Sequence, residues 1–117
     1  LEGRFEWRLP DAAANPYLAT AGLIAAWLDG LERRLDPGPA CTDDLFEQPL
    51  AALRERGIAV LPQSLAEAAD ALAADDVLCA ALGDDLSREF LAAKRAEWLA
   101  YARHVSDWEL QRYADAF

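Results

Sequence analysis

The chain has 117 residues and a formal net charge of −10, with a sequence pI near 4.4. Its length fits one domain, and its abundance of Ala and Leu with few Gly and Pro predicts a mainly helical fold. The acidic charge argues against nucleic acid and anionic membranes as partners, and no apolar run in the sequence is long enough to span a bilayer.

The first predicted element is a short N-terminal β-strand over residues 3–9, in which charged and apolar residues alternate. Successive strand residues face opposite sides, which places Arg4, Glu6 and Arg8 on one face and Phe5, Trp7 and Leu9 on the other. The apolar face would anchor the strand on a core. The charged face suits an anion or a metal ion, because a carboxylate is a hard oxygen ligand and guanidinium groups bind anions bidentately. A solvent-facing ladder of ion pairs is the alternative interpretation.

A helix over about residues 16–35 follows, with Asn15 as its N-cap and Pro16 at its first position. Its apolar residues recur at steps of three and four: Tyr17, Ala21, Ile24, Leu28, Leu31 and Leu35. Further apolar residues cover most of the remaining circumference, and a helix of that kind belongs inside a larger body. The chain also contains no methionine, and we expect it to be a segment of a larger protein.

Residues 38–63 are expected to form a loop with at most one short helical turn. Four more helices are predicted over about residues 65–74, 76–82, 85–104 and 107–116. Capping boxes begin two of them, at Ser64 and at Ser106.

The residues alone contain no complete catalytic constellation. His104 is the sole histidine and is expected to be a surface or packing residue. Cys41 and Cys79 lack metal-ligand spacing, and we expect free thiols in a cytoplasmic protein. All six glycines are isolated, so no phosphate-binding loop is predicted.

Several motifs occur together along the chain: Arg4-x-Glu6-x-Arg8-x-Pro10-Asp11, Ala13-Ala14-Asn15-Pro16-Tyr17-Leu18, Leu28-Asp29-Gly30, Asp36-Pro37-Gly38, Leu61-Pro62-x-Ser64-Leu65, Lys94-x-x-Glu97-Trp98 and Val105-Ser106-x-Trp108-Glu109. With these motifs the whole chain, residues 1–117, resembles the C-terminal portion of the α+β catalytic domain of the glutamine synthetase family. The start of the chain and the Glu97-Trp98 and Trp108-Glu109 pairs most resemble a subgroup that includes γ-glutamylmethylamide synthetase.

The resemblance implies an ATP-dependent ligase that joins glutamate to ammonia or a small amine through γ-glutamyl phosphate, with bound Mg²⁺ or Mn²⁺. Glu6 would be a ligand of the metal among the ATP phosphates. Arg4 would contact the transferring phosphate of ATP, and Arg8 would bind the substrate glutamate. These roles fit phosphoryl transfer, which depends on positioning and charge neutralisation. The isolated chain is expected to be inactive, because the family's other metal ligands and its ATP cradle are missing from it.

Two further expectations concern regulation and the alternative function. Many bacterial relatives carry a tyrosine that is adenylylated in the loop after the first helix, whereas Phe46 occupies the aligned loop here and has no hydroxyl. The alternative to a ligase is a non-catalytic acidic helical interaction domain derived from that family, which would bind a basic partner. An acidic surface that serves only solubility is the simpler explanation of the charge.

The terminal helix carries an apolar stripe formed by Leu110, Tyr113 and Phe117. The resemblance implies that this stripe packs against other subunits of a homo-oligomer, a double ring in the parent protein. The alternative is that the stripe folds back onto the preceding long helix, against Trp98 and Tyr101.

Overall fold

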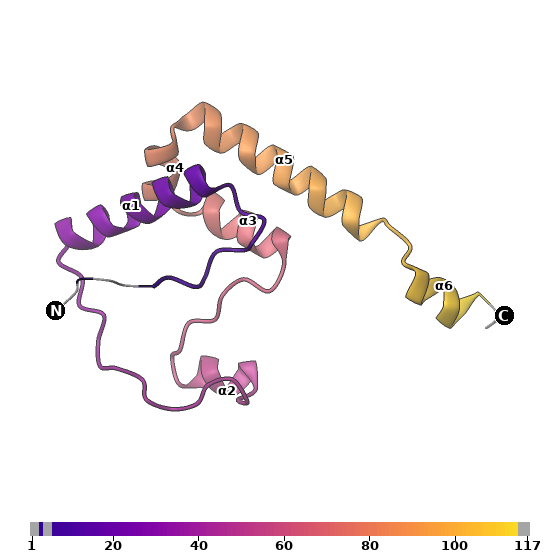
Figure 1. Ribbon diagram of the computed structural model, residues 1–117, viewed down its shortest axis with the longest axis horizontal. Helices are drawn as coiled ribbons and strands as arrows, with labels where there is room; N and C mark the ends of the chain where they lie inside the picture. The colour runs from indigo at the N-terminus through magenta and orange to yellow at the C-terminus, as the bar shows by residue number, and fades with distance from the viewer. Residues whose placement is uncertain (1–2, 4–5, 115–117) are drawn as a thin grey trace.

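The structure is a computed structural model that describes residue 3 and residues 6–114 (Figure 1). These residues form helices joined by loops and turns. In chain order the helices are α1 (Pro16–Glu32), α2 (Leu50–Glu55), α3 (Leu65–Ala73), α4 (Asp76–Leu82), α5 (Asp84–Ala102) and α6 (Asp107–Tyr113).

The β-strand predicted over residues 3–9 is wrong, because no strand occurs among the residues that the structure describes. The amide and carbonyl groups of a strand are paired with a neighbouring strand, and a lone extended segment is not stable as a strand in water. The described part of the chain offers no second strand. Residues 6–9 therefore run ahead of α1 without a partner strand, and the described fold is helical rather than α with a strand.

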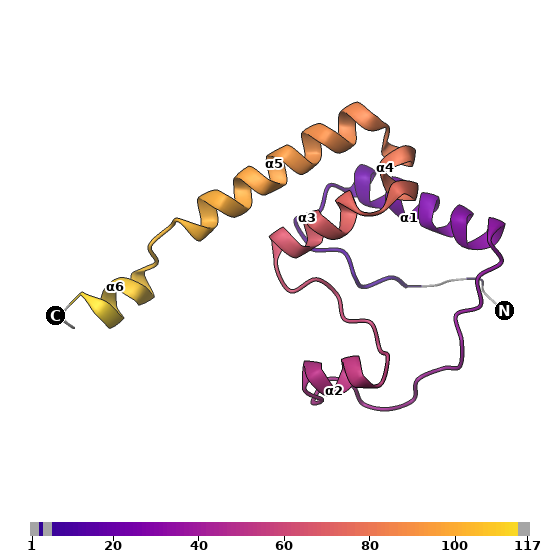
Figure 2. The same cartoon turned by 180° about the vertical axis from the view of Figure 1, so that it is seen from behind.

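Four helices form the body of the molecule. Helix α1 packs against α4, α3 packs against α4 and α5, and α4 also contacts α5. Within the described residues, α2 and α6 pack against none of the other helices. Figures 1 and 2 show α2 apart from this body and α6 beyond the far end of α5. The alternative in which α6 folds back onto α5 is therefore not the arrangement found.

The chain buries very little apolar surface. Leu53 and Ala69 are the buried hydrophobic residues in the described part of the chain. The radius of gyration is 18.5 Å, compared with about 13 Å for a compact domain of this length. The accessible surface is 10336 Å², compared with about 6300 Å² for a folded monomer of this mass. Much apolar surface that a self-contained domain would cover is thus exposed.

Helix α1 shows this exposure most clearly. The stripe predicted from its spacing faces outward, with Ile24 49%, Leu28 54% and Leu31 74% exposed. Its half-buried residues instead include Leu18 and Leu23, which lie on another side of the helix. The body of the chain thus covers one side of α1 and leaves the predicted stripe without cover.

Helix α1 ends at Glu32, earlier than the predicted residue 35. Arg34 adopts a left-handed conformation with φ of 50°, which turns the chain out of the helix. The amide of Arg34 then donates to Leu31 O (3.2 Å) and that of Leu35 to Gly30 O (3.0 Å). These two bonds form a Schellman motif, which satisfies carbonyls that the helix end would otherwise leave unpaired. Leu35 fits the apolar spacing but lies beyond the helix.

The other predicted helices lie within a few residues of their expected ranges. Local capping explains this agreement. The Ser64 hydroxyl accepts from Glu67 N (3.2 Å) at the start of α3, and the Ser106 hydroxyl accepts from Glu109 N (3.3 Å) at the start of α6. The backbone amide and the hydroxyl of Ser106 in turn donate to the Glu109 carboxylate, which lowers the pKa of Glu109.

Cys41 and Cys79 are free cysteines, as expected. Among the described residues, no helix combines the length and apolar character needed to cross a membrane.

Candidate functional site

The candidate site lies on the segment before α1, and a local turn joins the two. The amide of Ala13 donates to the Asp11 carboxylate at 2.6 Å, which bends the chain directly after Pro10. The Asn15 side chain then accepts from the amides of Tyr17 (3.0 Å) and Leu18 (3.2 Å) and caps α1. These hydrogen bonds reverse the chain, so that residues 6–9 run back beside α1 (Figure 1).

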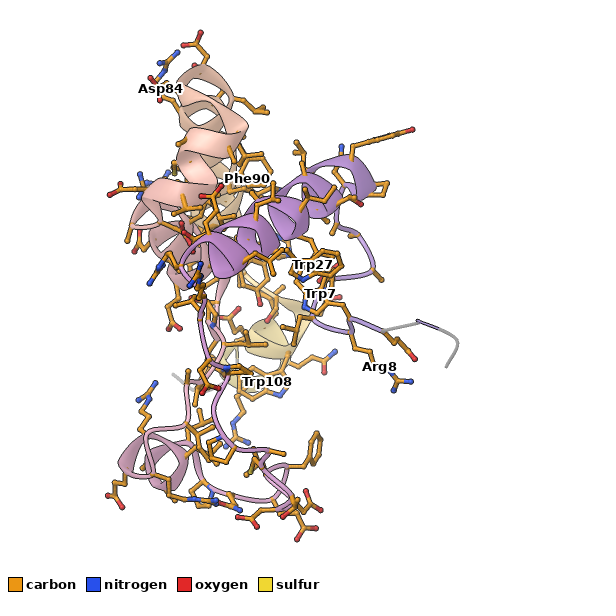
Figure 3. The ribbon with its side chains drawn as sticks, turned by 90° about the vertical axis from the view of Figure 1, so that its left-hand side faces the viewer. Trp7, Arg8, Trp27, Asp84, Phe90 and Trp108 are labelled. Atoms are coloured by element: carbon orange, nitrogen blue, oxygen red, sulfur yellow. The ribbon has the colours of Figure 1, made fainter. Side chains whose placement is uncertain are left out.

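Trp7 lies on the side of this segment that faces α1 (Figure 3). Its indole lines a hollow of about 270 Å³ between the segment and the first turns of the helix. The other lining residues are small, proline or aliphatic for the most part: Pro10, Asp11, Ala14, Pro16, Ala19, Thr20 and Leu23. Trp7 remains 40% exposed, so the hollow covers the ring only in part. Figure 3 shows Trp7 on the side of the segment that faces α1 and Arg8 on the outer side.

Glu6 and Arg8 meet on the outer side of the segment. The Arg8 Nε donates to Glu6 Oε1 at 2.7 Å, and both side chains are largely exposed. The two charged groups thus lie together even though the expected strand is absent. An exposed pair of this kind stabilises a fold by about 0–1 kcal/mol. Its main effect is to place a carboxylate and a guanidinium side by side, facing away from the body.

The third predicted site residue, Arg4, lies outside the described residues. The structure therefore brings together Glu6 and Arg8 of the predicted set and describes no position for Arg4.

Glu6 fits a divalent cation as one ligand among several. It offers hard carboxylate oxygens, which Mg²⁺ and Mn²⁺ prefer. In the described chain its Oε1 accepts from Arg8, and no hydrogen bond to its Oε2 is found, so one oxygen is available to a metal. Residues 3 and 6–114 contain no group of three or more His, Cys, Asp or Glu that could hold a metal ion. The described residues thus supply one ligand and not a complete metal site.

The loop that carries Phe46 is a second feature of interest. Asp44 accepts from the amide of Phe46 at 2.9 Å and so turns the chain. Arg56, which follows α2, donates to Gln48 (2.6 Å) and to the Asp43 carboxylate (2.6 Å). These hydrogen bonds hold the loop, and the Phe46 side chain on it is 98% exposed.

The sequence did not predict that Arg56 bonds to the Phe46 loop. Arg56 lies thirteen residues from Asp43 along the chain, and no spacing rule connects residues that far apart. A short-range signal existed only for Asp44, because Asp commonly bonds the backbone two residues ahead in turns.

Comparison with known proteins identifies the family. Residues 1–113 match the sequence model of the glutamine synthetase catalytic domain. The glutamate–methylamine ligase of Methyloversatilis universalis is 52% identical over 115 residues, which cover 98% of this chain and 26% of that protein. The glutamine synthetase of Halobacterium salinarum is 43% identical over 117 residues, which cover all of this chain and 26% of that protein. The glutamine synthetase of Thermus thermophilus is 43% identical over 110 residues, which cover 94% and 25%.

These matches confirm the resemblance seen in the motifs, including the likeness to a methylamine-using ligase. The chain spans about a quarter of the length of the relatives it matches. On this evidence the chain belongs to the glutamine synthetase family and corresponds to part of its catalytic domain.

Proposed function

We propose that the chain is the C-terminal segment of an ATP-dependent ligase that joins glutamate to ammonia or a small amine. The observation that carries this proposal is the Glu6–Arg8 pair, which lies on the outer side of a segment within the family match. The names of the relatives, glutamate–methylamine ligase and glutamine synthetase, support the same reaction class. A cytoplasmic location stays a prediction.

Each charged residue of the segment has a proposed role. Glu6 would supply one ligand to Mg²⁺ or Mn²⁺, which neutralises phosphate charge and orients ATP when bound. Arg4 would contact the phosphate that is transferred. Arg8 would bind the carboxylate of substrate glutamate, since a guanidinium matches a carboxylate bidentately. The γ-carboxylate of glutamate would take the terminal phosphate of ATP, and the amine would then displace that phosphate.

The isolated chain is proposed to be inactive and to act only with the rest of the protein. Glu6 is the one metal ligand proposed here, and a site for phosphoryl transfer needs more than one. The outward stripe on α1 also fits a segment whose apolar surface is covered by further polypeptide. Other subunits of a homo-oligomer are proposed as partners through α6, which packs against none of the other described helices.

The reaction class is tested by measuring ADP release in the full-length protein. We expect release that requires glutamate, a divalent metal, and either ammonia or methylamine. Comparing the two amines at equal concentration identifies the preferred one. If no amine supports glutamate-dependent ADP release, the ligase proposal is wrong and the acidic interaction domain becomes the better explanation.

The Phe46 loop is proposed to lack control by adenylylation. Treatment with a bacterial adenylyltransferase is expected to leave activity unchanged, because a phenylalanine ring has no hydroxyl to accept AMP. Mass spectrometry of a peptide spanning residues 38–54 measures this directly. The Phe46→Tyr variant is the matched control, since position 46 is 98% exposed and a tyrosine there would be accessible. An AMP group found on this peptide from the wild-type protein would contradict the prediction.

A further inference from the structure

We propose that Trp7 is the positioning residue for the charged side of the site. In this inference, which rests on the proposed function, the position of its indole beside the first turns of α1 sets how Glu6 and Arg8 face metal and glutamate (Figure 3). Trp7 itself would touch neither ligand.

The first observation concerns the backbone of the site segment. Among the described residues, the backbone groups of residues 6–9 make no hydrogen bond to the body of the chain. The Glu6–Arg8 ion pair joins two residues of the same segment and cannot hold that segment against α1. The hydrogen-bonded turn at Asp11 restrains only the end nearest to α1. The placement of residues 6–9 therefore depends on side-chain packing.

The second observation is that Trp7 lies on the α1 side of the segment, whereas Leu9 lines a separate hollow with the residues at the start of α3. On α1, Ala19, Thr20 and Leu23 line the same hollow as Trp7. Ala19 and Leu23 are four residues apart and so lie on one side of the helix, where a small and a branched residue leave room for a flat ring. Residues 6 and 8 do not line this hollow.

The third step follows from how the side chains of the segment lie. Glu6 and Arg8 hydrogen-bond to each other, while Trp7 between them lies on the side that faces α1 (Figure 3). Figure 3 shows this arrangement for Trp7 and Arg8. If the indole is lost, the segment can rotate and shift about the Asp11 turn. Glu6 and Arg8 would then move together, although their own chemistry is unchanged.

The test compares Trp7→Ala and Trp7→Phe in the full-length protein, using two readouts. One is KM for glutamate, which reports on Arg8. The other is Mn²⁺ affinity without substrates, measured by the electron paramagnetic resonance signal of free Mn²⁺, which reports on Glu6. We expect Trp7→Ala to weaken both by roughly ten-fold or more, because small displacements of binding groups are costly. Trp7→Phe keeps an aromatic ring at this position. Its KM for glutamate and its Mn²⁺ affinity should therefore stay close to those of the wild-type protein.

The pattern expected for Trp7 differs from that expected for Arg8, which is proposed to bind glutamate directly. Arg8→Lys should raise KM for glutamate and leave Mn²⁺ affinity nearly unchanged. In the Arg8→Lys background, Trp7→Ala should raise KM for glutamate by much less than it does alone, because the two residues act through one contact. Tyr101→Ala is the matched control, since this aromatic residue is 72% exposed near the end of α5. It should change neither readout.

A second variant keeps the test decisive if Trp7→Ala does not fold. Ala19→Leu keeps Trp7 but adds bulk on the α1 side of the hollow that both residues line, and it should shift the segment and weaken both constants. Unchanged Mn²⁺ affinity and unchanged KM in both Trp7→Ala and Ala19→Leu would overturn the positioning role while the proposed function stands. Absence of ligase turnover in the wild-type protein would overturn the proposed function, and the Mn²⁺ comparison would still decide the role of Trp7.

Discussion

Replacement of Glu6 by Gln in the full-length protein is expected to lower turnover by about 100-fold or more. The substitution keeps the shape of the side chain and removes the anionic oxygen proposed to bind the metal among the ATP phosphates. Higher Mn²⁺ or Mg²⁺ concentration should recover part of the activity, because the loss is first a loss of metal affinity. Steady-state ADP release at several metal concentrations measures both effects.

Two companion variants separate this effect from general damage. Arg8→Lys should mainly raise KM for glutamate, because an ammonium group cannot reproduce the bidentate hydrogen bonding of a guanidinium. Glu55→Gln removes an exposed carboxylate at the end of α2 and is expected to leave activity unchanged. Turnover of Glu6→Gln within a few-fold of wild type at ordinary metal concentration would show that Glu6 is not a metal ligand.

Deletion of residues 110–117 is expected to shift the full-length protein to smaller species. Helix α6 packs against none of the other described helices, and its Leu110 and Tyr113 are about half exposed. Tyr113 meets the ring of Trp108 edge-on, at 6.1 Å between ring centroids, which gives α6 an aromatic surface of its own. An exposed apolar surface of this kind favours contact with another subunit. Phe117, the last residue of the predicted stripe, lies outside the described residues.

Size-exclusion chromatography with light scattering measures the predicted change. Circular dichroism should show nearly the same helix content, since the deletion removes only part of a seven-residue helix. Gln111→Ala keeps the apolar residues of α6 and is the matched control. An oligomer of unchanged size after the deletion would rule out the docking role of α6.

The helix starts were predictable because their causes are local. Asn15, Ser64 and Ser106 each bond amides two or three residues ahead, and such bonds depend on nearby residues alone. The shared side of Glu6 and Arg8 was also predictable. Alternation of side chains along an extended chain needs no partner strand, and the two residues meet although the predicted strand does not form.

The early end of α1 was harder to predict. Leu35 continues the apolar spacing, and nothing in that spacing indicates that Arg34 takes a left-handed conformation. The motif that ends the helix there is stabilised by two backbone hydrogen bonds, and Arg34 stands at the left-handed position where a glycine would have indicated the helix end. Side-chain patterns therefore place the start of this helix better than its end.

The sequence by itself determined the family, the helical character and the shared side of Glu6 and Arg8, because motifs, capping residues and alternation act over a few residues. Only the tertiary structure decided that residues 6–9 form no strand, that the predicted apolar stripe of α1 faces outward, and that α6 does not fold back onto α5. Each of these outcomes depends on which distant surface is present to pair or pack. A pattern along one segment indicates that an apolar face or an open edge needs a partner, and the arrangement of the whole chain determines whether it has one.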